Sequence, residues 1–146
     1  MTTGIANQIS ARNQISGTVA DIQTGAAMSV VTVSASGHTI TSAITNQAVR
    51  ELGLAKHDHV IALVKATEAI IGKGDAGAMK ISARNKVSGR ITNIEKGSAM
   101  AAVTLDAHNW RLTTAITRQA ADDLQLTPGD QVTAFFKATE VLLQKA

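Results

Sequence analysis

Three short blocks of the sequence carry side chains that could bind an anion, and each block occurs twice. The blocks are Ser-Ala-Arg-Asn at residues 10–13 and 82–85, Ala-Ile-Thr at 43–45 and 115–117, and Lys-Ala-Thr-Glu at 65–68 and 137–140. Arginine offers five donors in a fixed geometry, lysine a compact positive charge, and threonine a hydroxyl. No candidate catalytic set recurs with them. The combination suits a small, fully ionised tetrahedral dianion held by directional hydrogen bonds, and it does not predict an enzyme.

Each of these residues also has a purely structural interpretation. Lys65 and Lys137 lie at the ends of largely apolar strand faces. Each ammonium group could extend into water or pair with a glutamate such as Glu68. Alternatively, it could be partly buried and available to bind an anion. The two arginines could simply be exposed at strand starts. Thr45 and Thr117 precede helical stretches, where N-capping and anion binding are compatible because a helix start presents unpaired N–H groups.

The blocks recur because the chain is an internal repeat with an offset of 72 residues, which carries Ser10 onto Ser82. About 28 of roughly 62 aligned pairs are identical, so one small module is duplicated. We expect domains at residues 1–72 and 80–146 with a linker at 73–79. Modules of this size bury little surface, and the chain has no cysteine that could form a stabilising disulfide. We therefore expect a symmetric homo-oligomer.

Short stretches of alternating or β-branched residues separated by turn signals predict about five strands and one short helix per module. In the first repeat the expected strands are 14–23, 27–35, 38–44, 58–66 and 67–71, with a helix over 46–52 between Thr45 and Gly53. In the second they are 86–95, 99–107, 110–116 and 131–138, with a helix over 118–124. The pattern predicts an all-β chain made of two tandem OB-like antiparallel β-barrels.

Composition excludes several classes of protein. The first residues lack a signal-peptide pattern, and no apolar run approaches a membrane span, so a cytoplasmic protein without a membrane partner is expected. The net charge is only +3, and the aromatic side chains are one tryptophan and two phenylalanines. A nucleic-acid-binding OB-like module would need more exposed aromatics and a denser basic groove. Two alternatives stay open: that nucleic-acid-binding module, and a module that only oligomerises.

Other polar and apolar residues are set aside. His57 and His59 could face one side and bind a metal ion, but the second repeat has Gly129 and Gln131 there, so surface histidines are the better interpretation. The methionine pair at residues 28 and 100 is interpreted as core.

The three blocks, in this order and twice, resemble the molybdate-binding Mop domain, and the tandem arrangement resembles the molbindins. The resemblance implies an OB-like fold, molybdate and tungstate as ligands, anions held at interfaces between Mop domains, and a homotrimer. It implies intracellular storage and homeostasis, with no organic cofactor and no bare metal cation. The ligand residues carried over are Ser10, Ala11, Arg12, Thr45, Ala48, Lys65, Ala66, Thr67, Ser82, Ala83, Arg84, Thr117, Ala120, Lys137, Ala138 and Thr139.

The sequence departs from two related groups of proteins. Molybdate-responsive repressors carry a DNA-binding domain before similar modules, and transporter ATPases carry a P-loop. Neither feature is present in this sequence. We therefore expect storage or buffering of the anion, without binding to nucleic acid.

Overall fold

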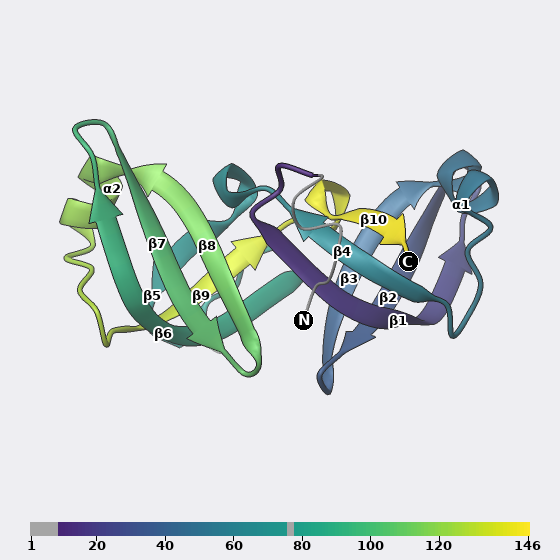
Figure 1. Ribbon diagram of the computed structural model, residues 1–146, viewed down its shortest axis with the longest axis horizontal. Helices are drawn as coiled ribbons and strands as arrows, with labels where there is room; N and C mark the ends of the chain where they lie inside the picture. The colour runs from purple at the N-terminus through teal and green to yellow at the C-terminus, as the bar shows by residue number, and fades with distance from the viewer. Residues whose placement is uncertain (1–8, 76–77) are drawn as a thin grey trace. The chain divides into compact units, whose positions relative to one another are not determined.

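The computed structural model describes residues 9–75 and 78–146. Residues 76 and 77 of the expected linker, and the amino-terminal stretch examined for a signal peptide, lie outside the described residues. The elements (Figure 1) are β1 (Asn13–Thr24), β2 (Met28–Ala35), β3 (His38–Thr45), α1 (Asn46–Leu52), β4 (His59–Val64), the 3-10 turn η2 (Ala66–Glu68), β5 (Ile70–Lys73), β6 (Asn85–Lys96), β7 (Met100–Ala107), β8 (Trp110–Thr117), α2 (Arg118–Asp123), β9 (Gln131–Phe136), the 3-10 turn η4 (Ala138–Glu140) and β10 (Leu142–Lys145).

The chain forms two units, and each unit contains one curled five-stranded antiparallel sheet. Unit 1 consists of residues up to 64 together with 137–146, and its strand order is β10-β4-β1-β2-β3. Unit 2 consists of residues 65–136, and its strand order is β5-β9-β6-β7-β8. The predicted all-β class, with one short helix in each repeat, is confirmed. Among the described residues, no helix is long and apolar enough to cross a membrane.

Each unit combines residues of both repeats, because the last strand of each repeat joins the sheet of the other. β5 pairs with β9, with Ile70 opposite Phe135, and β10 pairs with β4, with Leu142 opposite Leu63. Figure 1 shows β10, in yellow, beside the teal β4. Val141, just before β10, is 1 % exposed in the core of unit 1. The hydrophobic pattern of the sequence does not predict this exchange.

The curvature of both sheets depends on a glycine in the long first strand of each repeat. A side chain at Gly17 would meet the backbone of Ser34, and one at Gly89 would meet the backbone of Asp106. Only glycine allows neighbouring strands to approach this closely. A bulge follows in each strand, between Val19 and Asp21 in β1 and at the corresponding place in β6. These features bend the sheets around cores of mainly aliphatic side chains, which in unit 2 include Phe135 and Phe136.

A lysine at the end of each exchanged strand fastens it to the helix of the unit it joins. Lys145 Nζ donates to the Gly53 carbonyl at 2.9 Å and lies 3.4 Å from Asp58 Oδ2. Lys73 Nζ donates to the carbonyls of Leu124 and Gln125, both at 3.1 Å, and pairs with an aspartate in the same way. The last carbonyls of a helix lack partners within the helix and carry partial negative charge, so a lysine there is favourable.

The aspartates of these two clusters predict acid sensitivity. The N–H of Ala55 and then Lys145 hold the pKa of Asp58 below its ordinary value, and the N–H of Thr127 and then Lys73 do the same for the pKa of Asp130. A carboxylate whose pKa is lower in the folded than in the unfolded state stabilises the fold at pH values above the unfolded pKa of about 3.9. This stabilisation is lost as the pH falls through the folded-state pKa.

We therefore expect the double variant Asp58→Asn and Asp130→Asn to melt at a lower temperature at pH 7 and to lose less of its remaining stability between pH 5 and pH 2. Thermal melts across that range measure both effects. Asp123→Asn is the matched control, because that exposed carboxylate makes no ion pair among the described residues. The expectation would be contradicted if the melting temperatures of the double variant and the wild-type protein fell by the same amount between pH 5 and pH 2.

Candidate functional site

The Lys-Ala-Thr-Glu blocks form tight turns, and the exchange of strands carries each turn into the unit of the other repeat. Lys65 and Lys137 have extended backbone and stand immediately before η2 and η4. The Glu68 N–H donates to the Lys65 carbonyl at 3.0 Å, and the second turn has the same bond. η2 packs against β8 in unit 2, and η4 packs against β3 in unit 1. Each turn is thereby held beside the strand that leads into a helix of the unit.

This geometry corrects the sequence interpretation of the two lysines. The fourth strand was expected to run through residue 66, which would make Lys65 the end of an apolar face. β4 instead ends at Val64 and β9 at Phe136, and both lysines are exposed. The chain leaves the sheet there because the next residues form a 3-10 turn. The interpretation of the two lysines as partly buried ammonium groups is therefore wrong, because both side chains are exposed to solvent.

The predicted helix starts are present, and their threonines act as N-caps. Thr45 Oγ1 accepts a hydrogen bond from the Ala48 N–H, and Thr117 Oγ1 accepts one from the Ala120 N–H, both at 3.0 Å. A hydroxyl that accepts a hydrogen bond still has its own proton to donate. Both threonines are exposed. Each N-cap therefore offers an O–H donor to an anion, while the Ala48 and Ala120 amides are already engaged by the cap.

The first Ser-Ala-Arg segment is fixed by its alanine. Ala11 packs with Ile61 and Leu63 of β4, and it is 8 % exposed. Gln14 Nε2 donates to the Ala11 carbonyl at 3.1 Å. Ser10 and Arg12 are both exposed on either side of this buried residue. The same alternation occurs in the second copy, where Ala83 is buried between two exposed neighbours.

A cavity of about 380 Å³ in unit 2 brings together residues of two blocks from the two repeats. Its lining includes Thr67 from η2, and Thr117 and Ala120 from the start of α2. The other lining residues are Ala69, Ile70, Ile71, Met100, Ala115, Ile116 and Leu124. The Ser82–Arg84 segment does not line it. The cavity therefore collects three of the sixteen predicted residues, and the complete set stays a prediction.

Met100 shows what the sequence analysis missed around this cavity. It is 45 % exposed and Met28 is 43 % exposed, so the interpretation of this pair as core was wrong. Both stand at the start of a strand, opposite the N-cap threonine of their unit. Retention of methionine at both equivalent positions was the signal available in the sequence. The two methionines lie beside the helix starts and not in the core.

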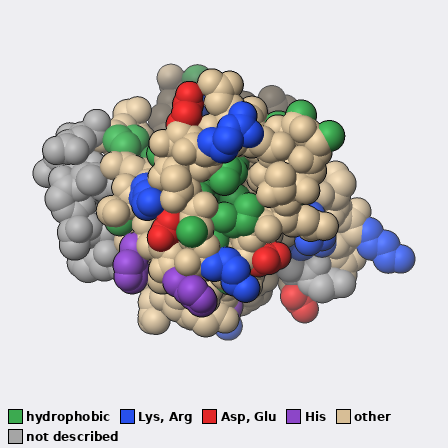
Figure 2. Space-filling model, turned by 90° about the vertical axis from the view of Figure 1, so that its right-hand side faces the viewer, with side chains coloured by type: hydrophobic (Ala, Val, Ile, Leu, Met, Phe, Trp, Pro, Cys, Tyr) green, Lys and Arg blue, Asp and Glu red, His purple; other side chains and the backbone are tan. Residues whose placement is uncertain are grey.

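Among the residues that the structure describes, the four cations of the predicted sites have no competing carboxylate. Arg12, Arg84, Lys65 and Lys137 are exposed, and none of them forms an ion pair within the part of the chain that the structure describes. Pairing of Lys65 with Glu68 is therefore not observed. Figure 2 shows one face of the molecule, on which basic, acidic and histidine side chains together surround a central hydrophobic area. An exposed, unpaired cation can bind an anion without first breaking a salt bridge.

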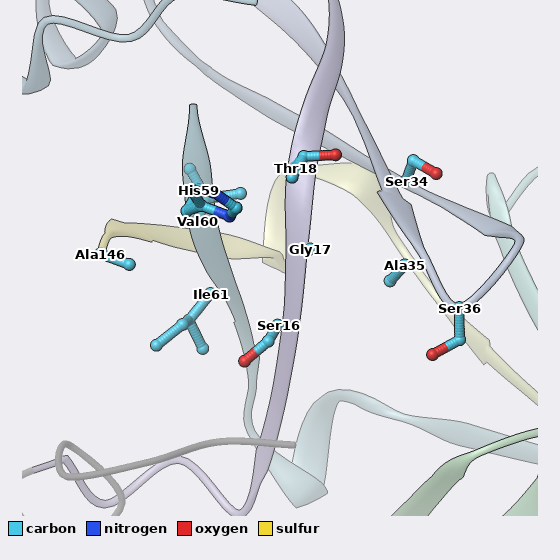
Figure 3. Close-up of a pocket in the computed structure, with 10 residues that line it drawn as sticks. All are labelled: Ser16, Gly17, Thr18, Ser34, Ala35, Ser36, His59, Val60, Ile61 and Ala146. Carbon is cyan, nitrogen blue, oxygen red and sulfur yellow. The ribbon is translucent and has the colours of Figure 1, made fainter. Parts of the chain in front are cut away.

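A second hollow in unit 1 is chemically different (Figure 3). It has a volume of about 470 Å³ and lies across β1, β2 and β4. Hydroxyls of Ser16, Thr18, Ser34 and Ser36 line it, with His59 beside them. It contains none of the sixteen predicted residues and neither lysine nor arginine. Lysine and arginine are likewise absent from the lining of the unit 2 cavity, so the two differ in that only the unit 2 cavity includes predicted residues. His57 and His59 are both exposed, as the sequence analysis expected.

Comparison with a known family model identifies the module in each repeat. The TOBE domain model matches residues 9–71 and 81–143, which together include all three blocks of both repeats. The matched ranges end at the exchanged strands.

Individual relatives agree with the family match. The chain is 36% identical over 135 residues to the molybdenum-pterin-binding protein MopA of Rhodobacter capsulatus, covering 90% of this chain and 50% of MopA. It is 34% identical over 136 residues to the molybdenum transport protein ModE of Herbaspirillum seropedicae, covering 92% of this chain and 50% of ModE. The chain thus spans about half the length of these curated relatives.

A solved structure matches over nearly the full length of both chains. It is the cytoplasmic molybdate-binding protein ModG, crystallised with molybdate bound. The match has a TM-score of 0.90 and 33% sequence identity, and it covers 95% of this chain and 99% of that chain.

Proposed function

Because the chain belongs to the TOBE domain family, with one domain in each repeat, we propose that it binds molybdate, and tungstate in the same sites, as a non-enzymatic protein. Its role is storage and homeostasis of the anion in the cytoplasm. The relatives whose names describe binding of molybdenum or molybdate support the choice of ligand. No organic cofactor, membrane or nucleic acid takes part.

One observation carries the proposal. In unit 2 the turn after Lys65 shares a cavity with the Thr117-capped start of α2, although the two come from different repeats. Lys65 does not line the cavity but directly precedes the turn, and it forms no ion pair among the described residues; the Thr117 hydroxyl has a proton to donate. A tetrahedral dianion needs this combination of charge and directional donors. Unit 1 has the equivalent residues in Lys137 and Thr45, with η4 packed on β3.

We further infer that the Ser-Ala-Arg segments complete the sites in a homo-oligomer, with a trimer as the simplest assembly. The Ser82–Arg84 segment does not line the unit 2 cavity, so the cavity by itself lacks the guanidinium that the predicted set contains. A guanidinium supplied by another domain would close the open side of the anion and exclude water. The exposure of Arg12 and Arg84 supports this arrangement.

Calorimetric titration of the anion-stripped protein tests the proposal. We expect saturable heat with sodium molybdate and sodium tungstate and little heat with sodium sulfate. Sulfate has shorter bonds, so donors spaced for molybdate would be left with stretched hydrogen bonds to it. The mass in solution should be that of a trimer. A folded oligomer that takes up no molybdate would contradict the proposal and favour a module that only oligomerises.

A further inference from the structure

The two turns that carry the predicted lysines are not held equally. In unit 1, the Ser42 hydroxyl donates to the Val141 carbonyl at 2.7 Å. Val141 follows directly after η4, and its N–H returns to the Ala138 carbonyl at 3.3 Å. Ser42 is 0% exposed and Val141 is 1% exposed, so water cannot replace this bond. The bond ties the Lys137–Ala138–Thr139 turn to the middle of β3.

In the described part of unit 2 the corresponding bond is not formed. The repeat offset of 72 residues places Thr114 where unit 1 has Ser42, and the strand registers agree, with Val31 opposite Ser42 and Val103 opposite Thr114. Thr114 is 0% exposed, and its Oγ1 has no hydrogen-bond partner among the described residues. The added methyl group of threonine restricts its side-chain rotamer. The Lys65–Ala66–Thr67 turn is therefore packed on β8 without this hydroxyl anchor.

We propose that Ser42 is a positioning residue that preorders the Lys137 turn for the anion, so that the two kinds of site in the chain have unequal affinity. This inference rests on the proposed function. A turn that is already in its binding conformation loses less conformational freedom when the anion binds. A turn that occupies that conformation only part of the time lowers the apparent affinity in proportion. The site that contains Lys137 is thus the tighter one, and the site that contains Lys65 is the weaker one.

The two sites can be measured separately in the full chain. The variant Lys65→Met leaves the site that contains Lys137, and Lys137→Met leaves the site that contains Lys65. We expect Ser42→Ala to weaken molybdate binding about three- to tenfold in the Lys65→Met background, as the loss of one buried hydrogen bond predicts. We expect Thr114→Ser to strengthen binding by a similar factor in the Lys137→Met background, because serine can make the bond that threonine does not.

A general loss of stability cannot imitate this pattern. Ser42→Ala should act on the Lys137 site and not on the Lys65 site, whereas loosening of the whole fold would weaken both. The gain from Thr114→Ser keeps the test decisive if Ser42→Ala folds poorly. Hydrogen exchange in the absence of anion gives a second measurement, since the Val141 amide should be better protected than the Ala69 amide and Thr114→Ser should protect Ala69.

The outcomes separate the two proposals. If the wild-type chain does not bind sodium molybdate, the proposed function fails. If it binds molybdate and both substitutions leave each site unchanged, Ser42 has no positioning role and the inference of unequal sites is overturned.

Discussion

Replacing Lys65 and Lys137 together by methionine should lower molybdate affinity by one to two orders of magnitude while the protein stays folded and assembled. Each predicted site contains one of these lysines. A hydrogen bond to a charged group contributes about 1.5–3 kcal/mol, which corresponds to roughly 10- to 150-fold in affinity. Both ammonium groups are exposed and form no ion pair with any described residue, so their removal should change the free energy of unfolding by no more than about 0.5 kcal/mol. Titration calorimetry, thermal melts and solution mass measure the three quantities.

The matched control removes the same charge elsewhere. Lys56→Met with Arg111→Met takes one exposed cation from each unit, both outside the predicted set, and Arg111 lies six residues from Thr117 along the extended β8, roughly 20 Å away. This control should bind molybdate with nearly wild-type affinity at moderate salt, since charges farther than about 8–10 Å away are screened. Equal affinity losses in the two double variants would mean that only general positive charge matters. Dissociation of the assembly in the Lys65 and Lys137 variant would instead assign these lysines to subunit contacts.

Features that depend on local sequence were predicted well. The strands β1 to β3 follow from β-branched alternation between glycine turns, and the first helix begins at its Thr45 cap and ends at Gly53, as expected. Gly53 has a φ of 60°, which glycine adopts without strain. The second helix ends one residue earlier than predicted, at Asp123. These features are decided by neighbouring residues, so the sequence contains the necessary information.

The partner of each last strand could not be predicted in the same way. Ile70 and Leu142 stand at equivalent places of the two repeats, and β4 and β9 present equivalent edges. The hydrophobic pattern is therefore satisfied whether a last strand stays in its own repeat or joins the other. The choice depends on the path of the chain after Val64 and Phe136. The turn there was misread as continuing strand because Lys-Ala-Thr-Glu contains neither glycine nor proline.

Deleting residues 137–146 should unfold unit 1, although the first repeat would remain intact in sequence. The deletion removes β10, leaves β4 as an unprotected edge, and takes away the carbonyl of Val141 that accepts from Ser42. Burial of a side chain such as Val141 contributes about 1.5–3 kcal/mol, and the lost ladder and Ser42 hydrogen bonds add about 1 kcal/mol each. The total is comparable with the whole stability of a small domain, about 5–15 kcal/mol.

Hydrogen exchange followed along the chain distinguishes the exchanged arrangement from two self-contained repeats. With exchanged strands, the deletion removes protection from residues 13–64 and leaves residues 85–136 protected, because β5 still completes the sheet of unit 2. If each repeat folded by itself, protection would be lost in the second repeat and kept in the first. Removing only Ala146 is the control, since it costs a single hydrogen bond to the His59 carbonyl and leaves the pairs of β10 in place. The same deletion removes Lys137, Ala138 and Thr139, so molybdate binding that remains must come from the sites that contain Lys65.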